Sequence, residues 1–311
     1  MNEAIQTIKQ AQQNVAVAGG KHIGNLISWN AEKIDVARVG ARGVFTGAGF
    51  GAQLIGELAA SSALTRAVGE VSRPKGLIVQ AFARPKGDTA AAFGIYVVNG
   101  RDDESGDEHT CGARVRVDRA TGQIVALPPE GSTGIKVALD LAEQITARAE
   151  HLRTHCETGD ITNAMVSAIK ALSGVPLRKW GGFYLLPPTS CRRWLALKPG
   201  LESLGVEVIT MELYDAPGAM ATASAAASGA LEADIAELLT DLDKVSKTGM
   251  RQDAINRRVT TCDELVAKAE LYRGVLSGLT DRISARVLQL QQEFKKHIKD
   301  DSPSFTVPVR D

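Results

Sequence analysis

The stretch GLIVQAFARPKGDTAAAFGIYVV, residues 76–98, decides the fold that we expect from this sequence. Its two ends, 76–83 and 92–98, are rich in β-branched and aromatic residues, which are typical of strands. Between them, Pro85-Lys86-Gly87-Asp88 has the Pro and Gly of a turn. The stretch therefore predicts two paired antiparallel strands.

Two further runs extend this predicted sheet. Residues 113–118 alternate apolar and polar side chains, and a turn at Ala120-Thr121-Gly122 leads into the run 123–127, which is apolar after Gln123. Together the four runs predict a meander of about four antiparallel strands. Apolar residues at helical spacing follow and predict a long amphipathic helix that covers one face of this sheet. These residues are Leu141, Ile145, Ala149, Leu152 and Cys156.

The strongest periodic signal lies near the C-terminus, where apolar residues repeat in heptads on both sides of Ser246-Lys247-Thr248-Gly249. We expect two antiparallel helices joined by this short turn, forming a coiled-coil hairpin. The second helix would be longer than the first, so its last third would need another surface to cover it. The expected interface consists of Leu231, Ile235, Leu238, Leu242, Val245, Leu265, Tyr272, Leu276, Leu279, Ile283, Leu290 and Phe294.

The order of these elements predicts an α+β fold, with an antiparallel sheet covered by helices and followed by the helical hairpin. We expect a small, mainly helical region at 1–75, an α+β domain at 76–216, the coiled-coil hairpin at 217–300 and a loose tail at 301–311.

Composition excludes several classes of protein. The chain has 311 residues, 44% of them hydrophobic, and a formal net charge of +0, which excludes extensive disorder. No apolar run reaches the roughly 18 to 20 residues of a membrane-spanning helix, and the polar N-terminus does not resemble a signal peptide. The four cysteines form no CxxC pair. We therefore expect free thiols and a cytoplasmic protein without membrane association.

Several short motifs resemble catalytic or nucleotide-binding signatures, but each lacks a required part. In Gly19-Gly20-Lys21-His22, neither the first glycine nor the Ser or Thr of a phosphate-binding loop is in place. Gly47 to Ala52 fits a loose GxGxxA pattern, but only Val44 and Phe45 precede it where a buried strand is needed. We therefore assign no catalytic residue and expect no cofactor.

His151 and His155 are four residues apart on the predicted helix, which places two imidazoles on one face. This spacing can bind a transition metal, but the sequence shows no third ligand and no HExxH pattern. We expect no bound metal and keep a metal-dependent enzyme as the third functional hypothesis.

The best candidate for a binding surface combines basic and aromatic residues between positions 178 and 194. Arg and Lys can neutralise phosphates, and aromatic rings can stack on bases, so these residues could bind nucleic acid. The alternative is that the rings anchor the core while the charges are solvated. The candidate residues are Arg178, Lys179, Trp180, Arg192, Arg193 and Trp194.

At these residues a resemblance appears. The segment PLRKWGGFYLLP (176–187), followed by a helix, Leu213-Tyr214-Asp215 and long helical heptads, is similar to uncharacterised proteins of phages and mobile elements. The similarity covers about the C-terminal half. It implies a phage-related or mobile-element setting and transfers no catalytic residue.

From these observations we expect a non-enzymatic assembly or adaptor protein. Its hairpin would bind a protein partner or a second copy of the chain. Nucleic-acid binding through the segment 178–194 is the main alternative.

Overall fold

The computed structural model describes residues 10–11, 13–16, 19–82, 90–102, 106–118, 120–178, 182–276 and 278–298. These residues form two compact units. Unit 1 comprises the described residues within 1–30, 166–202 and 206–311, and unit 2 comprises those within 31–165 and 203–205. Unit 2 is therefore inserted, in sequence, after the first strand of unit 1. The fold is mixed α+β with antiparallel sheets, as the sequence predicts.

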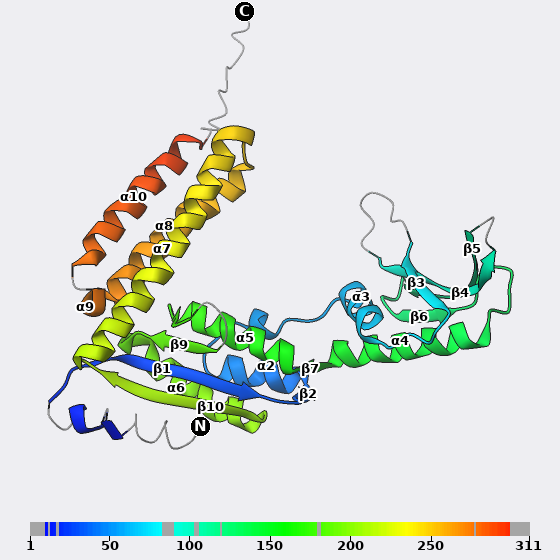
Figure 1. Ribbon diagram of the computed structural model, residues 1–311, viewed down its shortest axis with the longest axis horizontal. Coiled ribbons are helices and arrows are strands. Elements are labelled where there is room, and N and C mark those ends of the chain that lie inside the picture. Colours follow the sequence, from blue (N-terminus) through cyan, green and yellow to red (C-terminus); the bar gives the residue numbers. More distant parts are fainter. Residues whose placement is uncertain are drawn as a thin grey trace, which may run out of the picture. The chain divides into compact units, whose positions relative to one another are not determined.

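Unit 2 contains the predicted meander, a sheet with the order β3-β4-β5-β6 (Figure 1). Neighbouring strands pair antiparallel, and Leu77 lies opposite Val97 in the first pair. Helix α4 packs on this sheet with α3, and both share one apolar core with it. The strands are β3 (Leu77–Ala81), β4 (Ala92–Asp102), β5 (Gly106–Val117) and β6 (Ile124–Leu127), and the helices are α3 (Ala60–Glu70) and α4 (Lys136–Thr154).

The predicted helix ends before Cys156. The predicted apolar residues Leu141, Ile145, Ala149 and Leu152 are buried in the core that α4 shares with the sheet, as expected, but α4 stops at Thr154. The chain becomes extended at His155, where φ is −119° and ψ is 155°, and Cys156 lies in strand β7 (His155–Glu157). Strand β7 pairs antiparallel with β2 (Asp35–Ala37). The remaining elements here are α2 (Arg38–Gly47), η1 (Ala52–Ile55) and α5 (Thr158–Ala171), which continues into unit 1.

Unit 1 contains a sheet with the order β10-β1-β9-β8. Strand β1 lies in the region that the sequence indicated to be mainly helical, so that expectation is wrong for these residues. Buried and exposed side chains do not alternate along β1, so the sequence lacks the period-two pattern by which a half-buried strand is recognised. Gly24 in β1 approaches the carbonyl of Leu186 so closely that a Cβ would collide with it. The strands are β1 (His22–Ala31), β8 (Val175–Pro176), β9 (Phe183–Leu186) and β10 (Val206–Tyr214), and α6 (Pro188–Ser203) connects β9 to β10.

The C-terminal helices of unit 1 form a bundle and share one apolar core with Ile23, Leu185 and Leu213 of the sheet (Figure 1). All twelve expected interface residues lie in this core, ten buried and Leu242 and Leu279 partly buried. The helices are α7 (Pro217–Thr248), α8 (Gln252–Leu271), the short α9 (Arg273–Leu276) and α10 (Leu279–Lys296).

The expected two-helix coiled coil is not confirmed, because the second helix is interrupted. Helix α8 ends at Leu271, and α10 begins after Gly278, which has a left-handed φ of 89°. Helix α10 then folds back and packs against α8 and α7. The last third of the heptad pattern is therefore covered by α7 and α8 of the same chain. The length of the predicted second helix then gives no reason to expect a second copy of the chain.

Candidate functional site

The described residues of the basic and aromatic segment 178–194 differ in how far they are buried. Arg178 is exposed, with its guanidinium carbon 5.8 Å from the centre of the Phe183 ring. Arg192 and Arg193 are exposed on α6. Lys179 and Trp180 lie outside the described residues.

Trp194 is a core residue. Its side chain is fully buried, and its Nε1 donates a hydrogen bond to Thr210 Oγ1 at 3.2 Å. Trp29 lies beside it, with ring centres 6.5 Å apart, and stacks on Tyr184. The ring of Trp194 therefore cannot stack on a base, so its assignment to a nucleic-acid surface was wrong.

A groove of about 690 Å³ lies in unit 1, between α7, α8 and the segment 170–176. Small and apolar side chains line it from both helices: Ala230, Ala233 and Leu238 of α7, and Leu265 and Ala267 of α8. Ala233 and Ala267 are exposed, while Leu238 and Leu265 are buried. The groove thus has small residues at its surface above an apolar floor.

Two ion pairs join the helices that border this groove. Lys268 Nζ lies 2.8 Å from Asp234 Oδ2, and Arg258 Nη2 lies 2.6 Å from Asp241 Oδ2. The groove is also lined by Glu237 and Glu264 from the helices, and by Lys170. Four carboxylates and three basic groups therefore surround the apolar residues.

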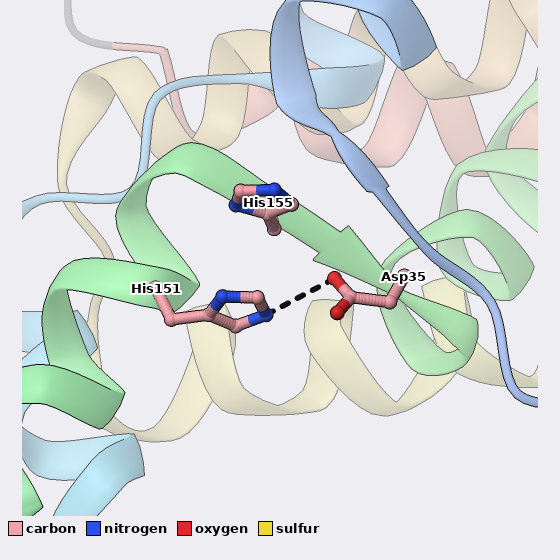
Figure 2. A group of neighbouring side chains, drawn as sticks. All are labelled: Asp35, His151 and His155. Carbon is pink, nitrogen blue, oxygen red and sulfur yellow. Dashed lines mark hydrogen bonds and ion pairs between the residues drawn. The ribbon is translucent and has the colours of Figure 1, made fainter.

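A second group of side chains lies in unit 2, where α4 gives way to β7 (Figure 2). Asp35, His151 and His155 each offer one ligand atom, and the three atoms lie within 4.8 Å of one another. His151 Nε2 is 3.0 Å from Asp35 Oδ1. The two imidazole rings stack with centres 4.4 Å apart and planes 10° apart. The structure thus supplies the third potential ligand that the sequence did not show.

The β2–β7 ladder explains how Asp35 reaches the histidines. Asp35 lies opposite Glu157, and Ala37 lies opposite His155, so Asp35 is a diagonal neighbour of His155 across the ladder. Asp35 is 116 residues from His151 in sequence. Strand β2 has three residues, too few to show a period, so the sequence offered no signal for this contact.

Arg38 holds the backbone that carries both histidines. Its buried guanidinium donates to the carbonyls of Leu152 and His155, each at 2.8 Å, and to that of Arg153 at 3.2 Å. These groups include carbonyls that the end of α4 leaves without helical partners. A cation at a helix C-terminus is also favoured by the helix dipole. The turn from α4 into β7 is therefore anchored by a charged side chain from α2.

A charge network next to this turn connects α3, α4, β7 and α5. Arg66 contacts Glu157 at 2.8 Å and Asp160 at 2.9 Å, and Arg148 contacts Glu70 and Glu157, each at 2.5 Å. Burial acts to raise the pKa of Glu70, but hydrogen bonds from Arg66 and Arg148 outweigh it and lower that pKa below its ordinary value. We assign this network a structural role.

The three buried cysteines, Cys156, Cys191 and Cys262, are not activated nucleophiles. Burial raises the pKa of Cys191 and Cys262 to about 11, and it also raises the pKa of Cys156. A thiol with a raised pKa carries little thiolate at neutral pH and reacts slowly.

Comparison with known proteins places the chain in one family. A model of the family of unknown function DUF6744 matches residues 22–300, so the chain belongs to this family. Neither the curated proteins nor the solved structures contain a significant match. Among the described residues, no helix combines the length and apolar character needed to cross a membrane.

Proposed function

We propose that this protein is a non-enzymatic assembly or adaptor protein that binds a protein partner through the groove between α7 and α8. The observation that supports this function is the groove itself, which has an apolar floor and charged residues around it. We place the protein in the cytoplasm, in a phage-related or mobile-element setting, as part of the same proposal.

A short amphipathic helix fits the shape of this groove. The lining residues of α7 run from Ala230 to Asp241, a length of about 16 Å at ~1.5 Å per residue. The exposed alanines permit close approach of another helix, and helix-in-groove binding uses apolar anchors at i, i+3, i+4 and i+7. Asp234 and Asp241 already form ion pairs with Lys268 and Arg258 of α8. Glu237 and Glu264 then favour a partner with basic residues flanking its apolar face.

The test is to fill the groove without disturbing the core. Ala233→Trp adds a large side chain at an exposed position that lines the groove. We expect recovery of the partner from the native host by the tagged full chain to fall at least about tenfold, the equivalent of ~1.4 kcal/mol. Quantitative mass spectrometry of the captured proteins measures this change.

Ala236→Trp is the matched control, because Ala236 is exposed on the same helix but does not line the groove. A partner retained by this variant and lost by Ala233→Trp supports the proposal. Equal recovery by both variants would contradict it. Removing all residues after Ala216 is a poorer test, because it would uncover apolar residues of the sheet that pack on these helices.

Nucleic-acid binding has less support than groove binding. Arg178, Arg192 and Arg193 are exposed, but Trp194 is buried, so among the described candidates no aromatic ring remains for stacking. Exposed arginines alone bind phosphates without reading sequence.

A further inference from the structure

We propose that Asp35, His151 and His155 form a binding site for a divalent transition metal of the Zn²⁺ class. The ligand set carries this inference. Imidazole nitrogens together with one carboxylate suit zinc, iron, nickel or copper, whereas Mg²⁺ and Ca²⁺ prefer oxygen ligands alone. The site is independent of the groove, because it lies in unit 2 and the groove lies in unit 1.

The position of the histidines also favours a cation. His151 and His155 lie at the C-terminal end of α4, where the helix dipole is negative. Asp35 adds a full negative charge 3.0 Å from His151. The side chains of Asp35 and His151 are 53% and 34% exposed, so water can reach the ion and complete its coordination. Zinc sites that keep an open position have three protein ligands and a water molecule, and the proposed site would have the same arrangement.

Thr154 contacts the ring of His155. Its hydroxyl contacts the carbonyls of Glu150 and His151 at 3.2 and 3.1 Å and His155 Nδ1 at 2.9 Å. When the Thr154 hydroxyl donates to one of these carbonyls, the contact with His155 is Nδ1–H donating to the Thr154 oxygen. In that tautomer the lone pair of neutral His155 is on Nε2, where it is available to a metal. Such partners of ligating histidines orient the ring and tune affinity.

The ligands need only side-chain movement to close on an ion. At Zn–N and Zn–O distances of about 2.0–2.1 Å, tetrahedral ligand atoms lie about 3.3 Å apart. His151 Nε2 and Asp35 Oδ1 already lie near this separation. The backbone is held meanwhile by Arg38 and by a hydrogen bond of 3.0 Å from Ile34 N to Thr158 Oγ1. Rotation of the partly exposed side chains therefore suffices.

The test is titration of the chelator-treated full chain with ZnCl₂ by calorimetry, with Co²⁺ absorption as a probe of geometry. We expect one ion per chain, and loss of this binding in His151→Ala and in His155→Ala. Asp35→Asn should weaken binding at least tenfold, because it removes the charged ligand. Thr154→Val should weaken it about 10- to 100-fold, and Thr154→Ser should restore it.

His297→Ala is the matched control, since His297 is exposed at the end of α10 and outside the three-residue group. It should bind zinc like the unaltered chain, and circular dichroism should show that every variant is folded. Absence of zinc binding by the unaltered chain would overturn the proposal. So would an affinity that is unchanged in Asp35→Asn, because two histidines alone would then hold the ion.

Discussion

At the scale of single residues, Tyr272 shows how one polar atom is accommodated in an apolar core. Its ring is fully buried, and its hydroxyl lies 2.9 Å from the carbonyl oxygen of Ser173 and 3.0 Å from that of Leu185. Burial raises the pKa of this phenol, so it stays protonated and acts as a donor. The residue therefore joins the helical bundle to the sheet of unit 1 at a specific point.

We expect Tyr272→Phe to destabilise unit 1 by about 1–3 kcal/mol, because the carbonyls of Ser173 and Leu185 lose the single O–H donor that they share. Urea denaturation followed by circular dichroism measures the change. Tyr214→Phe is the control, since the Tyr214 hydroxyl bonds to Glu212 at an exposed position, and it should cost less than about 0.5 kcal/mol. Similar losses in both variants would be inconsistent with a special role for the buried hydroxyl.

At the scale of elements, the break between α8 and α10 determines how the heptads are used. The sequence predicted which residues are apolar and helical, because the 3.6-residue period is local information. It did not predict the reversal, because glycine inside a helical pattern is also tolerated without a break. Gly278 adopts a left-handed φ of 89°, whereas Gly274 has no positive φ and lies within α9.

We expect Gly278→Ala to destabilise the bundle by about 1 kcal/mol or more, because a Cβ disfavours its left-handed backbone. Gly274→Ala is the paired variant, since the nearest atom to an added Cβ there is Lys21 Nζ at 3.9 Å. It should be neutral or stabilise by up to about 1 kcal/mol. Urea midpoints of the two variants give the comparison. Equal effects, or a stable Gly278→Ala, would show that the turn does not depend on glycine.

At the scale of the whole molecule, the charge network of unit 2 predicts sensitivity to acid. A carboxyl group whose folded pKa is lowered stabilises the fold above its unfolded pKa, near 4.3–4.5, and this stability is lost as the pH falls through the lowered folded value. Glu70 has such a lowered pKa because of Arg66 and Arg148. Its partial exposure limits the contribution to about 0.5–1 kcal/mol.

Glu70→Gln should therefore cost about 0.5–1 kcal/mol at pH 7, and this difference should shrink as the pH falls below the unfolded pKa of about 4.3–4.5. Urea midpoints measured between pH 7 and pH 3 follow the change. The control is Glu143→Gln on the exposed side of α4, which removes a carboxylate outside the charge network and should leave the network's contribution intact. A difference between Glu70→Gln and the unaltered protein that persists at pH 3 would refute this explanation.

The sequence predicted more of unit 2 than of unit 1, for a physical reason. In the meander, each strand pairs with the next strand along the chain, and α4 follows directly after it. Turn residues and hydrophobic periodicity in the sequence are therefore enough to predict these elements. Strand β1 pairs with β9, far along the chain, and the proposed metal ligands Asp35 and His151 meet through the three-residue strand β2. The strand β10 was predicted from its own residues, but long-range pairings leave no local pattern, so neither the pairing of the unit 1 sheet nor the third ligand could be anticipated.

The insertion of unit 2 after β1 has a consequence for biosynthesis. The backbone amide of Lys21, next to β1, is capped by the side chain of Asp215, which lies 194 residues later in the chain. At about 5–20 residues per second, a ribosome needs roughly 10 to 40 s to make that interval. During this time β1 has left the exit tunnel before its partner β9 exists, while unit 2 can already assemble from consecutive segments. We expect this unpaired strand to be prone to non-native pairing and aggregation until β9 has been made.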